Sequence, residues 1–287
     1  MIKYIIMVFA GACSFGILST FVKLAYHEGY STAEITFSQA LIGMLVLWLL
    51  NCFQRKSNQP RINGKTWLSL LLTGAAIGLT TFVYYVSVHY IPASLAIVIL
   101  MQFTWMGALL EWIFFKKKPG WIQVFIMLVI IGATVMASGL INAPVSLTGI
   151  LYALGSAFLY AIYIVINSRT IEHISPLRKS AIIMTGSTLI ILVVNMHVLL
   201  SNNHFDWNLL RWALFFGLFG TIIPQALFAR GIPKVGAGIS AIIMTVELPV
   251  AVITAHVVLK EPVGLIQWAG IMIMLSAIVL MNIRALK

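Results

Sequence analysis

Long apolar segments, separated by short polar ones, follow one another along almost the whole chain. Because an apolar helix of about 20 residues crosses the hydrocarbon core of a bilayer, each of these segments predicts a membrane-spanning helix. The ten predicted spans are 4–26, 33–53, 66–88, 93–115, 121–141, 148–168, 179–200, 207–229, 235–258 and 264–283. The longest connection, 54–65, is too short to fold as a separate domain. The pattern therefore predicts an all-α, polytopic membrane protein.

The composition narrows the class of protein further. Hydrophobic residues make up 61% of the 287 residues and charged residues 9%, with a mean hydropathy of +1.03, which is not the composition of an ordinary soluble domain. No GxxxxGK[ST] motif is present, so we expect no nucleotide-driven motor within this chain. The first apolar segment follows Lys3 as in a signal peptide, but nine further spans favour an uncleaved first helix.

The formal net charge of +11 describes the topology of the chain, not a nucleic-acid partner. If the amino terminus is cytoplasmic, all but three of the 18 basic residues lie on the inner side, the exceptions being Lys23, Arg211 and Lys260. Cytoplasmic loops carry an excess of Lys and Arg. We therefore expect both termini to be cytoplasmic, in a multi-pass protein of the cytoplasmic membrane that contacts lipid and no nucleic acid.

The two halves of the chain resemble each other. A shift of 144 residues superimposes Gly11 on Gly155 and Ala93 on Ala237, and it also aligns the span boundaries. Each half holds five spans, and since five is odd the second half enters the membrane in the opposite sense. We predict two inverted five-helix repeats, 1–142 and 146–287. Such repeats are a recurrent plan of secondary transporters, which bind substrate near the membrane midplane where the repeats meet.

Several motifs give the chain a family resemblance. They are Gly11-Ala-Cys-Ser-Phe-Gly16 leading to Lys23, Glu247-Leu-Pro249-Val-Ala-Val, and Leu259-Lys-Glu261-Pro262. In these the chain resembles the EamA-type ten-helix exporters of the drug/metabolite transporter superfamily. The resemblance implies export of a small molecule through a central cavity lined mainly by spans 1, 3, 4, 6, 8 and 9. The first half departs from the family pattern before span 5, where Lys117 and Lys118 replace an acidic residue.

Glu247 is the one acidic residue near the middle of a predicted span. An ionisable group at that depth costs roughly 2.5–3.5 kcal/mol on insertion scales and usually faces a bundle interior or a water-filled path. Two roles are open for its carboxyl group. Burial favours the neutral form, which would link a cationic substrate or proton exchange to its charge state; alternatively, the carboxylate would receive the amino group of a zwitterionic substrate.

Two prolines and a lysine are the candidates for residues that kink helices or gate the transport path. Pro224 and Pro249 lie deep within spans 8 and 9, and each removes a backbone donor and kinks its helix. The carbonyl groups that they free are tolerated at membrane depth where they are buried in protein or line a wet cavity. Lys23, near the outer end of span 1, matches the lysine of the family's span 1; this resemblance implies a part in an extracellular gate, and an interfacial anchor is the alternative.

Further polar and aromatic side chains lie in the predicted spans that line the cavity. Small ligands are usually held by apolar and aromatic walls with a few placed polar groups. Beside Glu247, the substrate-binding candidates are Gln102, Trp105, Tyr84, Tyr160, Tyr163 and Gln225. Packing within the bundle is the alternative role for each of them.

These features favour a secondary transporter that exports a small metabolite, an amino acid or a related amphipathic compound, by alternating access. Efflux of cationic lipophilic drugs is an alternative within transport. A membrane-embedded enzyme is the alternative from another class, but no HExxH, GxSxG or pair of midplane carboxylates supplies catalytic groups. We expect no catalytic residues, cofactor or metal. The partners expected are the substrate and, if Glu247 titrates, protons; the oligomeric state is open.

Overall fold

The computed structural model describes residues 2–53, 62–116, 118–137, 146–168, 174–201, 206–235, 243–244 and 246–285, and these fold almost entirely as helices. The helices are α1 (Ile2–Gly16), α2 (Leu18–His27), α3 (Thr32–Phe53), α4 (Gly64–Tyr90), α5 (Ala93–Leu100), α6 (Phe103–Phe115), α7 (Trp121–Ala137), α8 (Leu147–Ser168), α9 (Pro176–Ser201), α10 (Trp207–Gly217), the π-helix η1 (Leu218–Ile222), α11 (Ile223–Val235), α13 (Glu247–Leu259) and α14 (Leu265–Ala285).

The helices account for the predicted spans. Seven helical stretches of the described residues are long and apolar enough to cross a membrane, and three shorter apolar helices lie at 124–137, 247–259 and 265–280. Spans 1, 4 and 8 each consist of successive helices: α1 with α2, α5 with α6, and α10 with η1 and α11. The prediction of an all-α, multi-pass membrane protein is confirmed.

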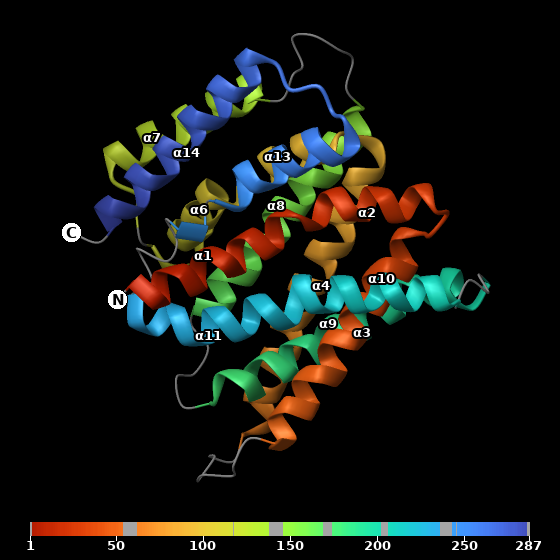
Figure 1. Cartoon of the computed structure of the whole chain (residues 1–287). Helices are drawn as coiled ribbons and strands as arrows, with labels where there is room; N and C mark the ends of the chain where they lie inside the picture. Colours follow the sequence, from red (N-terminus) through yellow and green to blue (C-terminus); the bar gives the residue numbers. More distant parts are fainter. Residues whose placement is uncertain are drawn as a thin grey trace.

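The packing of the helices repeats itself between the two halves. Helix α4 (span 3) packs against α8 (span 6), and α1 (span 1) packs against α11 (part of span 8). Each of these contacts joins the third span of one half to the first span of the other half. Helix α3 packs against α9, α5 against α13, and α7 against α14, each pair joining equivalent spans. Helices α7 and α14 lie side by side at one edge of the bundle, and the start of α1 and the end of α14 lie on the same side (Figure 1). This arrangement is the one expected of an approximate twofold axis.

Small residues allow the helices of the scaffold to approach closely. Gly74 of α4 lies against the carbonyl group of Ile183 in α9, and Gly186 of α9 lies against the carbonyl group of Leu71 in α4. A Cβ atom at either glycine would overlap the opposing backbone. Interfaces of small residues are how membrane helices gain packing contacts without a hydrophobic driving force. The α4–α9 contact therefore fixes the scaffold beside which the candidate site lies.

Candidate functional site

Spans 4 and 9 share a break in the helix near their middle. Between α5 and α6, the Gln102 N–H donates to the Ile99 carbonyl at 3.0 Å; before α13, the Val246 N–H donates to the Ile243 carbonyl at 3.2 Å. These hydrogen bonds span three residues instead of four, and they occupy equivalent positions in the two halves. A local tightening of this kind in mid-helix often marks a functional hinge.

The causes of the two breaks differ. In span 9, Pro249 has no N–H to donate to the carbonyl four residues earlier, so the regular helix begins again at Glu247. In span 4 the position equivalent to Pro249 is Trp105, whose indole Nε1–H donates to the Gln102 side-chain Oε1 at 2.8 Å. One break is thus made by a proline and the other is accompanied by a side-chain hydrogen bond.

Glu247 lies at the break in span 9, as the first residue of α13. Its carboxyl group makes no hydrogen bond or ion pair with a described residue, and Tyr84 of α4 and Tyr160 of α8 lie within electrostatic range of it. Gly16, at the end of α1, lies against the Glu247 backbone carbonyl and the Val250 side chain. Glu247 therefore lies near residues of spans 1, 3 and 6.

Two hydroxyl groups in this part of the bundle are buried without a hydrogen bond of good geometry to a described residue. Tyr84 Oη and Ser19 Oγ of α2 lie near each other, and neither makes a well-formed hydrogen bond to a described residue. A buried hydroxyl that lacks a partner costs about 1–3 kcal/mol, so such groups are rare outside functional sites. Glu247, Tyr84 and Ser19 together form what we call the central site.

Aromatic rings continue the central site on one side. Tyr160 and Tyr163 of α8 are stacked with ring centroids 5.8 Å apart, and Phe103 of α6 meets Tyr160 edge-on at 4.7 Å. Phe103 is the counterpart of Glu247 in the other half, so one repeat supplies a carboxylate where the other supplies an apolar ring. The wall around the single acid is therefore asymmetric and largely aromatic.

The structure places Gln102 and Trp105 apart from the central site. The Gln102 Nε2 donates to Thr134 Oγ1 of α7 at 2.6 Å, and its Oε1 accepts the Trp105 indole hydrogen. Both side chains line a cavity of about 200 Å³, together with Thr134 and apolar residues of α5, α7 and α8. Gln102 and Trp105 thus form a second polar group, whose hydrogen bonds are satisfied by each other and by Thr134. Tyr163 is linked to the central site through its stacking on Tyr160.

Pro224 follows a π-helix, which explains how span 8 tolerates it. The Ile223 N–H donates to the Leu218 carbonyl, five residues earlier. If the next hydrogen bond followed the same five-residue spacing, the Phe219 carbonyl would accept it from the N–H of residue 224. Pro224 has none, and Ser14 Oγ of α1 donates to the Phe219 carbonyl instead, at 2.5 Å. The side chain of Gln225 lies outside the described residues.

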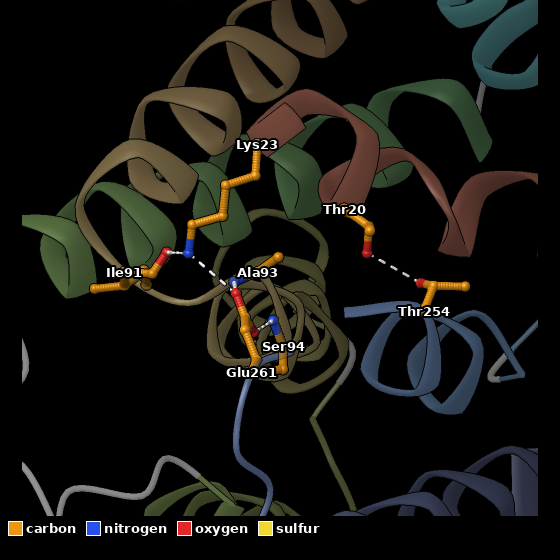
Figure 2. Close-up of polar contacts among 7 residues, drawn as sticks. All are labelled: Thr20, Lys23, Ile91, Ala93, Ser94, Thr254 and Glu261. Carbon is orange, nitrogen blue, oxygen red and sulfur yellow. Dashed lines mark hydrogen bonds and ion pairs between the residues drawn. The ribbon is translucent and has the colours of Figure 1, made fainter. Parts of the chain in front are cut away.

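Lys23 lies at the predicted outer end of the bundle and contacts Glu261, which is not among the site residues predicted from the sequence. Its Nζ is 3.0 Å from Glu261 Oε1, in the short connection between α13 and α14 (Figure 2). Burial opposes the charge of Glu261, but hydrogen bonds from Ser94 and Ala93 and the charge of Lys23 outweigh it and lower the pKa of the carboxyl group. The sequence offers one indication of this pair: Lys23 and Glu261 both fall on the predicted outer side, where basic residues are few.

Comparisons with known proteins agree with this architecture. Residues 2–139 and 147–283 each match the model of the EamA-like transporter family. An uncharacterised transporter of Synechocystis is 22% identical over 273 residues, which are 88% of this chain and 82% of the relative. A threonine/homoserine exporter of Salmonella typhimurium is 24% identical over 213 residues, or 73% of this chain and 69% of the relative. A solved crystal structure covers 96% of this chain and 98% of its own, with a TM-score of 0.64 at 15% identity, and so shares the fold.

Proposed function

The chain belongs to the EamA-like transporter family, and from that premise we propose that it exports a small amphipathic metabolite, an amino acid or a related compound, across the cytoplasmic membrane. The two family matches confirm the resemblance seen in the motifs of the sequence, and both halves of the chain take part in it. Transport by alternating access would let the central site face one side of the membrane at a time.

The observation that carries the proposal is the position of Glu247. Its carboxylate begins a half-helix in mid-span, and the free N–H groups at a helix start stabilise negative charge. The hydroxyl groups of Tyr84 and Ser19, which are buried without a well-formed hydrogen bond to a described residue, are the other polar groups of the central site. A ligand with an ammonium group for the carboxylate and an acceptor or hydroxyl group for Tyr84 and Ser19 would satisfy all three polar groups.

The ligand that fits this arrangement carries both charge and apolar surface. The ring of Tyr160, stacked on Tyr163 and met by Phe103, offers an apolar wall next to the carboxylate. Amino acids and their amine or alcohol relatives combine one ammonium group with a short polar or apolar side chain. The name of one relative, a threonine/homoserine exporter, supports the same class of substrate.

Counterflow in proteoliposomes tests the proposal. Vesicles preloaded with an unlabelled amino acid, amine or sugar would be given the same labelled compound outside, at two values of internal pH. We expect exchange of at least one compound that carries an amino group, and none of neutral sugars. Exchange of sugars alone would contradict the proposed role of the carboxylate. A rate that changes with internal pH would assign protons as the coupled species.

A further inference from the structure

One carboxylate joins three elements at the predicted outer end of the bundle. Glu261 Oε1 accepts hydrogen bonds from Lys23 Nζ at 3.0 Å and from the Ala93 N–H at 2.9 Å, and Oε2 accepts one from Ser94 Oγ at 2.6 Å. Ala93 and Ser94 are the first residues of α5, so the carboxylate also caps that helix. Lys23 additionally donates to the Ile91 carbonyl at 3.3 Å (Figure 2).

These contacts join the two repeats. Lys23 and α5 come from the first half of the chain, whereas Glu261 follows α13 in the second. Beside them, the hydroxyl groups of Thr20 in α2 and Thr254 in α13 are 3.0 Å apart (Figure 2). Helix α13 begins at Glu247 and ends two residues before Glu261, so the same helix connects the central site with this outer cluster. Opening a path from Glu247 to the outside beside α13 requires these contacts to break.

The position of Glu261 is fixed by the end of α13. Lys260 adopts a left-handed conformation, with φ of 59°, and the Glu261 N–H then donates to the Ala255 carbonyl in the manner of a helix-ending turn. Lys116 ends α6 with φ of 56°, and no other described non-glycine residue has a positive φ. Lys116 and Lys260 occupy equivalent positions in the two halves, so both repeats turn the chain alike before their last span.

The residues carried by these equivalent turns differ. Glu261 corresponds to Lys117, and Lys23 corresponds to Asn167. A lysine and an asparagine contain no carboxylate, so this pair cannot form the ion pair that Lys23 and Glu261 form. The inverted symmetry would put that pair at the cytoplasmic end. At these equivalent positions, the sequence therefore supplies an ion pair for the outer end alone.

We propose that Lys23, Glu261 and the start of α5 form a lock that holds the outer end closed and makes the inward-facing state the resting state. An exporter that rests in this state presents its site to the cytoplasm, where its cargo is. The direction of transport rests on the proposed function, whereas the lock itself does not.

Thiol labelling from outside tests the lock without any substrate. In a chain carrying Cys13→Ala and Cys52→Ala, Ser19→Cys puts one thiol in the central site, one helical turn below Lys23. We expect a membrane-impermeant methanethiosulfonate added outside to react slowly with this thiol. Lys23→Met and Glu261→Gln should each raise the rate by about tenfold or more, because each breaks charge-assisted hydrogen bonds.

Arg211→Gln is the matched control, since Arg211 also lies on the predicted outer side but its hydrogen bond among the described residues goes to Asn208 of its own helix. Its labelling rate should stay at the starting value. Size-exclusion chromatography in detergent identifies variants that have lost the fold, and these are excluded. An unchanged rate in folded Lys23→Met and Glu261→Gln proteins would overturn the lock, as would an equal rise in Arg211→Gln. A failed counterflow experiment would remove the transport assignment and leave this result intact.

Discussion

At the scale of single residues, the polar candidates differ in whether their hydrogen bonds are satisfied. Glu247 makes no hydrogen bond or ion pair with a described residue, and the hydroxyl groups of Tyr84 and Ser19 are buried without a well-formed one. By contrast, the amide of Gln102 finds partners in Thr134 and Trp105, as a structural polar group does. The two kinds of polar residue have similar sequence contexts, and only their contacts distinguish them.

Tyr84→Phe should separate ligand binding from folding. It removes a hydroxyl group that has no well-formed hydrogen bond to a described residue, so the thermal unfolding temperature should stay the same or rise. The apparent KM for transport should rise about tenfold if the hydroxyl group bonds the substrate. Tyr26→Phe is a control, since its hydroxyl group donates to the Tyr85 carbonyl and its loss should lower stability. A Tyr84→Phe protein that is less stable and transports normally would assign Tyr84 to packing.

At the scale of elements, the hydropathy pattern predicted the spans well because it depends on length and composition alone. The expected span 33–53 is α3, Thr32–Phe53, and 93–115 covers α5 and α6. The irregularities inside the spans were harder to predict. Pro249 and Pro224 marked two of them, but the break at Gln102 has no proline. In the π-helix before Pro224, the Phe219 carbonyl is paired with Ser14, which lies 205 residues away in the sequence.

The close packing of α4 against α9 can be tested by a substitution at Gly74. Gly74→Val puts a branched side chain where the carbonyl group of Ile183 lies, and the helices must separate. We expect loss of the monodisperse protein in detergent, or destabilisation of about 3 kcal/mol or more. Gly132→Val in α7 is the matched control, because a Cβ atom at Gly132 meets nothing within 4 Å. Equal thermal stability of the two variants would contradict the packing described for α4 and α9.

At the scale of the whole molecule, the two repeats share a backbone and differ in their chemistry. The equivalent breaks at Gln102 and Val246 and the equivalent turns at Lys116 and Lys260 follow from common local geometry. The polar groups do not repeat. In the first half, the position equivalent to Glu247 is Phe103, and the position equivalent to Glu261 is Lys117. The sequence indicated the repeats and the lone acid at the midplane. It could not indicate the contact between Lys23 and Glu261, which depends on how the repeats pack.

The outer cluster also predicts a pH dependence of stability. Because the pKa of Glu261 is lowered on folding, its ionised carboxyl group contributes to the stability of the folded protein. This contribution is complete above the ordinary pKa of 4.5, and it is lost as the pH falls below 4.5 through the pKa of the folded state. His256 contacts the Glu261 backbone carbonyl, not the carboxylate. The difference in unfolding temperature between the wild type and Glu261→Gln should be constant from pH 6 to 8 and shrink below about pH 4.5. A difference that grows on acidification would contradict the stated contacts.

The central claim is that cargo meets Glu247 at the junction of the two repeats, and counterflow by the Glu247→Gln variant tests it most directly. The glutamine keeps the size of the side chain and removes its charge, and Glu28→Gln serves as the control at an exposed carboxylate that accepts a hydrogen bond from Trp212. We predict that Glu247→Gln folds as the wild type does and loses at least about tenfold in exchange rate, as expected when a charged partner of the ligand is lost, while Glu28→Gln exchanges normally. Wild-type exchange by a folded Glu247→Gln protein would contradict the account.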